Sequence, residues 1–405
     1  MIETGESHET RKTHVPGEKG AVVMTGGTAA GLVDWRTVER LTALIPAGPS
    51  ASRSTRASSV AVLRRSAQEA PGWVARITGL DWAAQQVAKT VRVSVVDRAG
   101  LVRASIRALR GLMDQVPAPR ASEAVRLVGA AEVAGAMSVL ATRLLGQMVP
   151  AAPSGADGAR PGVARSGGGD REASASPHLL LVAPNVLAVR RQMDLDVLDL
   201  PAWVCLHETT HAVQLAAAPW LGPYLTDSMR TVIGAVVEAV YGGSGGGDRV
   251  SAEGRASRPR RGGAMRVAAR ATRGRVLEGL TNLKERSEVA SLAATLTFLE
   301  GHAEVVLDDV RPNRMPSVHR LRADLSRSRA ADGGIGPGPG LGALLLHRLM
   351  GLEAKEAQYA DGAAFVRSAV ARIGHEGLNV VWTDPTLLPT PAEIARPDAW
   401  VRRVG

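Results

Sequence analysis

The sequence predicts a mainly α-helical fold with little β-structure. Stretches rich in Ala and Arg repeat apolar residues at the helical period, and two long runs of helical type follow in the second half of the chain. Strand-like apolar runs are rare, and the clearest is 179–183. Aromatic residues make up only 3% of the chain, so Leu, Val and Ala must build the core. The expected helices cover residues 51–69, 99–113, 121–149, 200–218 and 287–309.

The composition also predicts how the chain is organised. Polar or Gly-rich segments cannot bury enough apolar surface to order themselves, so they are expected to be loops or tails within one main helical body. Glycine and proline dominate residues 333–340, which we interpret as a loop. The remaining segments, in order, are a disordered tail (1–29), an N-terminal helical region (30–150), a flexible loop (151–177) and a second region (178–405) with a flexible insert (243–263).

The helix at 200–218 contains the pattern His-Glu-x-x-His, formed by His207, Glu208 and His211. Positions i and i+4 share one face of a helix, so both imidazoles can bind one Zn²⁺. Glu208 then stands beside the open position of the metal, where it can accept a proton from water as a general base. The pattern is typical of a catalytic zinc site.

The residues around this motif are apolar on nearly every side, which indicates a buried helix. Buried imidazoles and carboxylates are costly without partners, and a metal ion would satisfy them. Asp199 is a plausible cap for the helix, Pro201 suits its first turn, and Pro219 ends it. Cys205 is expected to be a small core residue, and a lone cysteine can form no intramolecular disulfide.

A catalytic zinc site needs a third protein ligand. A histidine six residues after the second imidazole is excluded, because that position is Ala217. The run at 287–309 offers Glu300, Glu304 and Asp308 on one helix face, so one carboxylate could bind Zn²⁺ and the next could orient a ligand histidine. Gly301 lowers helix stability by about 1 kcal/mol relative to Ala, and a close approach of the two helices would explain it.

Two longer runs carry a family resemblance. His-Glu-Thr-Thr-His-Ala-Val-Gln at 207–214 and Leu-Glu-Gly-His-Ala-Glu-Val-Val-Leu-Asp at 299–308 resemble the actinobacterial zincin-like metallopeptidase family, which includes a subgroup associated with deazaflavin coenzyme biosynthesis. Shorter matches extend the resemblance over most of residues 30–405. The resemblance implies a zincin-like helical body, with the strand at 179–183 supplying a sheet edge beside the metal helix.

The same resemblance implies roles for the motif residues. His207 and His211 would bind Zn²⁺, and Glu208 would be the general base. In other gluzincins the Glu before Gly binds the metal, which favours Glu300 as the third ligand. Glu304 is the rival ligand, and the carboxylate that does not bind the metal is expected to support the site from outside the coordination sphere. Asp308 is the further candidate for that outer role.

We therefore expect a zinc-dependent metallohydrolase, a gluzincin-type peptidase that uses metal-activated water on a peptide or protein substrate. The alternative is a catalytically inactive zincin-fold protein that binds metal or serves as a scaffold in coenzyme metabolism, and its site would be closed by four protein ligands. Tyr359 is the candidate for stabilising the oxyanion. His302 lies on the opposite side of the helix from Glu300, so we expect it to have a supporting role. The oligomeric state is not predicted.

The net charge of +10 raises the question of nucleic-acid binding. Most of the excess lies in the insert at 243–263 and around the cluster Arg320, Arg322, Arg327 and Arg329, which has no aromatic residues to stack on bases. We therefore expect no nucleic-acid partner. The first residues lack a basic run followed by an apolar core, and no apolar stretch reaches the roughly 18 residues that span a bilayer. These observations favour a cytoplasmic protein that does not associate with membranes.

Overall fold

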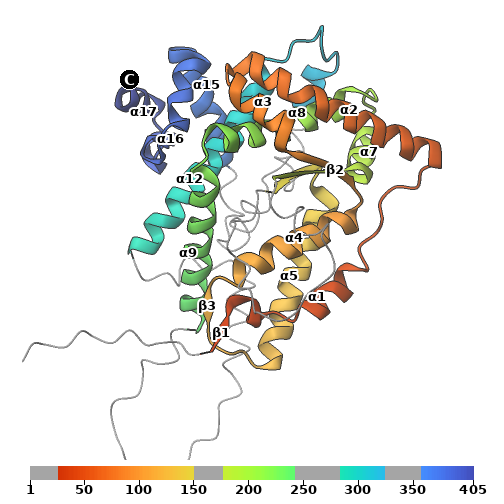
Figure 1. Cartoon of the computed structure of the whole chain (residues 1–405), viewed down its shortest axis with the longest axis vertical. Helices are drawn as coiled ribbons and strands as arrows, with labels where there is room; N and C mark the ends of the chain where they lie inside the picture. The colour runs from red at the N-terminus through yellow and green to blue at the C-terminus, as the bar shows by residue number, and fades with distance from the viewer. Residues whose placement is uncertain (1–25, 150–176, 242–282, 324–356) are drawn as a thin grey trace, which may run out of the picture.

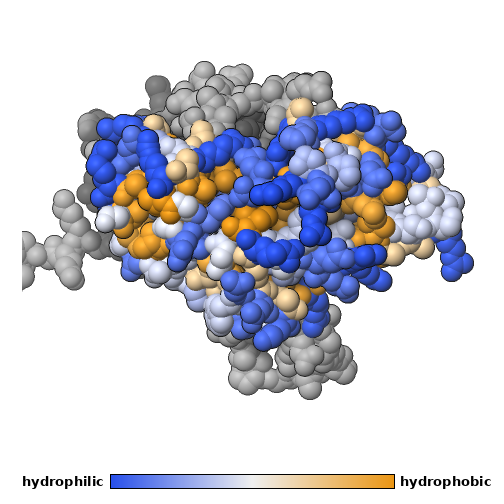
Figure 2. All heavy atoms as spheres, turned by 90° about the horizontal axis from the view of Figure 1, so that it is seen from above, coloured by the Kyte–Doolittle hydropathy of each residue, from blue (hydrophilic) through white to orange (hydrophobic). Residues whose placement is uncertain are grey.

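The computed structural model describes residues 26–149, 177–241, 283–323 and 357–405 (Figure 1). Helices dominate these residues, which confirms the predicted mainly α fold. Viewed from above, hydrophilic side chains cover much of the surface, and apolar residues show between them (Figure 2). The predicted loops at 243–263 and 333–340, nearly all of the loop at 151–177 and most of the tail at 1–29 lie outside the described residues.

The N-terminal region contains five α-helices and four short strands among the described residues. Its main helices begin at capping side chains: Ser52, Asp97 and Ser122 each accept a hydrogen bond from the backbone N–H three residues later. The elements are β1 (Gly27–Thr28), the 3-10 turn η1 (Ala29–Leu32), α1 (Trp35–Thr42), α2 (Arg53–Thr78), α3 (Asp81–Thr90), β2 (Arg92–Val96), α4 (Arg98–Met113), β3 (Pro117–Ala118), α5 (Glu123–Arg143) and β4 (Gly146–Val149).

The second region begins with the predicted strand, which is followed by helices. Its elements are β5 (His178–Val182), α7 (Ala183–Gln192), α8 (Asp199–Ala217), α9 (Leu221–Tyr241), α12 (Leu283–Asp308), α15 (Ala357–Leu378), the 3-10 turns η4 (Asn379–Trp382) and η5 (Pro385–Leu387), α16 (Pro391–Ile394) and α17 (Pro397–Val404). The helices predicted at 200–218 and 287–309 correspond to α8 and α12.

The helix predicted at 121–149 is wrong at its C-terminal end. The chain leaves the helix after Arg143, because Leu144 adopts an extended conformation with φ −69° and ψ 133°. The next residues form β4, which pairs with β5 over four residue pairs. Pairing with a strand distant in sequence therefore outweighs the local helical pattern, and the last residues of this stretch become part of a sheet.

The three-stranded sheet has the order β2-β5-β4, with β2 parallel and β4 antiparallel to β5. The strand expected to lie at a sheet edge, β5, is therefore the central strand, and this expectation was wrong. Both faces of β5 are buried, which explains its unbroken run of apolar residues. Helix α8 contacts both β5 and β4, and β4 is the strand at the edge of the described sheet. Since β2 and β4 come from the N-terminal region, the sheet joins the two regions.

Helices cover the two faces of this sheet. Leu179 and Leu181 point into a core shared with α2, α3 and α8, whereas Leu180 and Val182 point into a core shared with α1, α4 and α5. In Figure 1, α2, α3 and α8 lie above the sheet, and α4 and α5 lie below it. The α8 helix is thus enclosed by the sheet on one side and by α2 and α3 on another, which agrees with its apolar sequence.

Asp199 does not cap α8 as predicted. The residue before the helix is Leu198, which makes no capping side-chain hydrogen bond, and Asp199 is the first helical residue. Its carboxylate instead accepts a hydrogen bond from the backbone N–H of Ser317, at 2.7 Å. The carboxylate therefore ties the start of α8 to the segment after α12.

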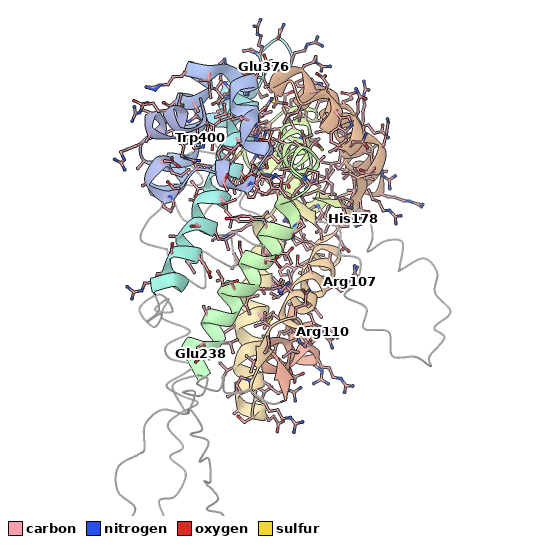
Figure 3. The ribbon with its side chains drawn as sticks, turned by 60° about the vertical axis from the view of Figure 1, so that its left-hand side comes forward. Arg107, Arg110, His178, Glu238, Glu376 and Trp400 are labelled. Carbon is pink, nitrogen blue, oxygen red and sulfur yellow. The ribbon has the colours of Figure 1, made fainter. Side chains whose placement is uncertain are left out.

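Helix α12 packs closely against α15, not against α8, at Gly301. A Cβ atom added to Gly301 would lie 2.2 Å from the carbonyl carbon of Gly362 in α15. The close approach expected from this glycine therefore exists, but its partner was wrongly expected to be the metal helix. The C-terminal helices complete the packing, with the fully buried Trp400 inside them (Figure 3). In the segment after α15, the Asn379 side chain donates to the Thr78 carbonyl of α2, at 2.8 Å.

One helix among the described residues, α5, is long and apolar enough to cross a membrane by length and composition. No apolar stretch of this length was expected from the sequence, and the charged residues Arg126 and Glu132 do lie within this helix. Ala130, Ala134 and Met137 on α5 are buried in the core shared with α1 and α4. This face of α5 therefore contributes to the packed layers of the fold.

Two members of the arginine cluster make backbone contacts in the fold. Arg320 donates to two carbonyls in the segment between α7 and α8, and Arg322 donates to carbonyls at the C-terminal end of α12. Arginine at a helix C-terminus satisfies carbonyls that lack helical partners. Arg327 and Arg329 lie outside the described residues. Arg320 and Arg322 thus hold backbone segments together.

Candidate metal centre

Helix α8 positions the residues of the His-Glu-x-x-His motif. His207 and Glu208 are 1% and 3% exposed, because the sheet, α2, α3 and α12 surround this part of the helix. His211 lies one turn further along and is partly buried. The two imidazole rings are perpendicular, with their centroids 4.9 Å apart. The helix therefore directs both Nε2 atoms toward one point, where they lie 3.3 Å from each other.

Glu300 of α12 completes this arrangement. One carboxylate oxygen lies 3.4 Å from the Nε2 atom of His207, and the other lies 3.5 Å from the Nε2 atom of His211. One ligand atom from each of the three side chains lies within 4.8 Å of the others. Among the described residues, this is the group of His, Cys, Asp or Glu side chains that could hold a metal ion. We refer to these three residues as the His–His–Glu cluster.

Strong electrostatic coupling joins the members of this cluster. Burial alone lowers the pKa of His211, but the Glu300 carboxylate outweighs it and raises that pKa to about 9. Burial alone raises the pKa of Glu300, but His211 and His207 hold it well below its usual range. A positive charge is thus favoured between the carboxylate and the imidazoles. A divalent cation would supply that charge and would leave both imidazoles neutral.

Glu208 lies beside the cluster in a different environment. Burial raises the pKa of Glu208 from its ordinary 4.5 to about 8, a shift that Glu300 reinforces and that His211 and the backbone N–H of Met148 oppose. Its Oε1 atom is buried and has no hydrogen-bond partner in the described part of the chain. Buried carboxylate oxygens normally have a partner, so this oxygen is suited to a proton or a water molecule. Such a carboxyl group can exchange protons near neutral pH.

Strand β4 brings a glycine against Glu208. A Cβ atom added to Gly146 would lie 2.6 Å from Cγ of Glu208 and 2.9 Å from its carboxyl carbon. Real Cβ atoms do not approach other atoms so closely, so a side chain at position 146 would displace the Glu208 side chain. The edge strand thus shapes the space that this carboxyl group occupies.

The other two candidate carboxylates on α12, Glu304 and Asp308, face a different partner. Arg367 of α15 lies 2.9 Å from a carboxylate oxygen of Glu304 and 2.7 Å from one of Asp308. The structure therefore brings Glu300, but not Glu304, to the histidine pair. The three acidic residues do share a helix side as predicted, but two of them hold α12 against α15.

Two further candidate residues are His302 and Tyr359. His302 is fully buried, and burial together with His375 and His211 lowers its pKa to about 3, so it is a neutral imidazole. Its Nδ1 atom lies 3.0 Å from the side-chain nitrogen of Gln214, outside the cluster. Tyr359 falls in the first turn of α15, and its side chain lies outside the described residues. Its predicted role in oxyanion stabilisation stays a prediction.

Sequence reasoning missed the parts played by Gln214 and Gly146. Gln214 was noted only as the last residue of the matched run at 207–214, yet its Oε1 atom lies 2.9 Å from Nδ1 of His211. The available signal was a polar residue one turn after the second histidine, in the otherwise apolar last part of α8. Gly146 offered no such signal, because its contact with Glu208 depends on how β4 folds against α8.

The chain matches the family model described as zincin-like metallopeptidase over residues 33–401. The chain belongs to the zincin-like metallopeptidase family. The donor set of the His–His–Glu cluster agrees with this membership, because two imidazole nitrogens and a carboxylate are ligands that zinc prefers at catalytic sites. Family membership supports a metal-dependent hydrolase.

Other comparisons add information on the fold alone. A crystal structure from Chloroflexus aurantiacus, described as that of a "putative hydrolase with a novel fold", matches with a TM-score of 0.56 at 21% sequence identity. The match covers 92% of this chain and 98% of that chain, so the two share their fold over nearly their whole lengths. The curated proteins contain no significant match to this chain.

Proposed function

We propose that the protein is a zinc-dependent peptidase of the gluzincin type. His207, His211 and Glu300 would hold the metal, and Glu208 would be the general base. The observation that carries this proposal is the convergence of two imidazole nitrogens and one carboxylate, with a second buried carboxyl group beside them. Three protein ligands leave a coordination position for water, as catalytic zinc sites require.

Each residue would have a distinct part in hydrolysis. Zinc, when bound, polarises the substrate carbonyl and makes a water molecule more acidic. Glu208 would accept a proton from water as the water oxygen bonds to the substrate carbonyl carbon, and the same carboxyl group would deliver that proton to the leaving amine as the C–N bond breaks. The raised pKa of Glu208 suits both transfers near neutral pH. Burial of Glu208 keeps bulk water from competing for this proton.

The substrate proposed from the family is a peptide or protein, acted on in the cytoplasm. The finer resemblance, to actinobacterial proteins associated with deazaflavin coenzyme biosynthesis, stays a prediction from sequence. The scaffold alternative has less support, because it gives no role to a buried carboxyl oxygen without a partner next to the cluster. A closed structural site would use a fourth protein ligand, and Glu304 is paired with Arg367 instead.

The substitution Glu208→Gln tests the proposal. The amide has the shape of the carboxyl group but cannot accept the proton, so hydrolysis of a peptide library should fall about 10²- to 10⁴-fold. Zinc content, measured on the same purified samples, should stay at one ion per chain because Glu208 is not a proposed ligand. Equal hydrolysis by the variant and the wild type would contradict the role of Glu208. A wild-type protein that binds no zinc would contradict the proposed function as a whole.

A further inference from the structure

We propose that Gln214 is a positioning residue that determines which nitrogen His211 presents to the metal and holds Glu300 in register with it. This inference rests on the proposed function. Gln214 is 1% exposed and lies on α8, one turn after His211. Its side chain makes three hydrogen bonds, one to His211 within α8 and two to residues of α12.

The orientation of the Gln214 amide follows from one of these contacts. The Nε2 atom lies 2.9 Å from the backbone carbonyl oxygen of Leu299, which can only accept a hydrogen bond. The atom facing Leu299 must therefore be the NH₂ nitrogen, and the reverse orientation would bring two acceptors together. The second N–H of the same group points to Nδ1 of His302, at 3.0 Å. The contact with the Leu299 carbonyl therefore distinguishes the amide nitrogen of Gln214 from its amide oxygen.

This orientation determines the tautomer of His211. The Oε1 atom of Gln214 faces Nδ1 of His211 at 2.9 Å and can only accept, so Nδ1 must carry the proton. A neutral imidazole has one protonated nitrogen, which leaves the lone pair on Nε2. That nitrogen is the one directed at Glu300 and His207. Gln214 thereby prepares His211 to bind a metal through Nε2.

The contact with Leu299 also sets the position of Glu300. Leu299 is the residue before Glu300, so a hydrogen bond to its carbonyl fixes α12 at the point where the third ligand leaves the helix. His302, also on α12, accepts the second hydrogen bond from the Gln214 amide. Its ring stacks near Phe298, with centroids 6.4 Å apart, and meets Trp382 edge-on at 5.3 Å. The acceptor of the second N–H is therefore held rigidly by aromatic neighbours.

Two substitutions separate the two roles. In Gln214→Met the side chain keeps its length but can neither accept from His211 nor donate to α12. In Gln214→Glu the carboxylate still accepts from His211, as carboxylates do in many zinc sites, but cannot donate to Leu299. Thr210→Val is the matched control, because Thr210 is equally buried on α8 and its hydroxyl donates only to Leu206 within the helix.

The measurement is the zinc dissociation constant of the full-length proteins, determined by competition with a chromophoric chelator after circular dichroism has shown that each variant is folded. Loss of a group that orients a ligand histidine costs about 10- to 100-fold in metal affinity, so Gln214→Met should weaken zinc binding by that factor. Gln214→Glu loses only the attachment to α12, so its loss of zinc affinity should be smaller than that of Gln214→Met, whereas Thr210→Val should stay within about threefold of the wild type. Equal losses in the Met and Glu variants, or no loss in the Met variant, would overturn the assignment of the His211 tautomer.

Thermal unfolding of the metal-free proteins tests the attachment to α12 without zinc. Both Gln214 variants leave the Leu299 carbonyl without its donor, so both should unfold at lower temperature than Thr210→Val. Unfolding at or above the temperature of that control would overturn this part of the inference. If the wild type bound no zinc, the proposed function would fail, whereas the attachment would still be decided by the unfolding temperatures.

Discussion

Gly301 of α12 and Gly362 of α15 are in direct backbone contact. A Cβ atom on Gly301 would lie 2.2 Å from the Gly362 carbonyl carbon, and one on Gly362 would lie 2.2 Å from the carbonyl oxygen of Thr297. Gly301 follows Glu300, so this contact fixes α12 next to the proposed third ligand. The position of that ligand therefore depends on α15, a helix that contributes no described side chain to the cluster.

Gly301→Ala should destabilise the protein although alanine favours helices. Overpacking against a rigid backbone typically costs about 1–3 kcal/mol, which outweighs the gain of about 1 kcal/mol in helix propensity. Gly111→Ala in α4 is the control, because an added Cβ at Gly111 meets no atom within 4 Å. Urea denaturation should show a lower midpoint for the first variant and an equal or higher one for the second. Equal midpoints would mean that α12 and α15 separate at little cost.

The third ligand can be identified by comparing Glu300→Gln with Glu304→Gln. The first variant loses a carboxylate of the His–His–Glu cluster and should bind zinc at least about tenfold more weakly. The second loses an ion pair with the half-exposed Arg367 and should keep its zinc affinity, with a stability loss of less than about 1 kcal/mol. Zinc titration of both variants provides the test. Weaker binding in the Glu304 variant alone would reverse the assignment.

Gly146→Ala should lower hydrolysis while zinc stays bound. The added methyl group would displace the Glu208 side chain, whose Cγ atom lies 2.6 Å from the position of the new Cβ. Misplacement of a general base by about 1 Å can cost about a hundredfold in rate. Zinc content and peptide hydrolysis should be measured on one preparation. Unchanged hydrolysis would show that β4 moves to accommodate the methyl group and that the position of this strand does not constrain Glu208.

The metal-free protein should lose stability as the pH rises. His211 has a folded pKa of about 9, above its ordinary 6.5, so its contribution is complete below 6.5 and is lost as the pH rises through 9. The folded pKa of Glu208 is about 8, above its ordinary value of 4.5. Its contribution to the free energy of unfolding is therefore lost as the pH rises from 4.5 to about 8. The lowered pKa of Glu300 changes the free energy of unfolding only as the pH falls below about 4.5, its ordinary value.

Unfolding temperatures measured with a chelator should therefore be lower at about pH 9 than at about pH 6. Zinc affinity should change in the opposite direction, because the metal displaces protons from the imidazoles and binds better as the pH rises. A metal-free protein that is more stable at the higher pH would show that the charges in the cluster are not coupled as described.

The sequence predicted the parts of the fold that depend on local pattern. The α8 helix follows from the apolar residues around the His-Glu-x-x-His motif, α12 follows from its long run of helical type, and β5 follows from its short run of apolar residues. The fourth strand, β4, was missed because four residues after a helix carry little signal until they pair with β5. The convergence of Glu300 with the histidine pair was expected from motif resemblance alone. Contacts such as that of Gly146 with Glu208 arise from folding over long sequence distances and have no local signature.

The hydrogen bond from Asn379 to Thr78 joins residues that are 301 positions apart. Synthesis proceeds from the N-terminus, so α8 leaves the ribosome well before α12. Helix α12 in turn leaves it before the segment after α15 that hydrogen-bonds to α2. A growing chain therefore contains His207 and His211 long before it contains Glu300 and helix α15, which packs against α12 beside Glu300. Under the proposed function, zinc should therefore be bound firmly only after α12 and α15 have been synthesised.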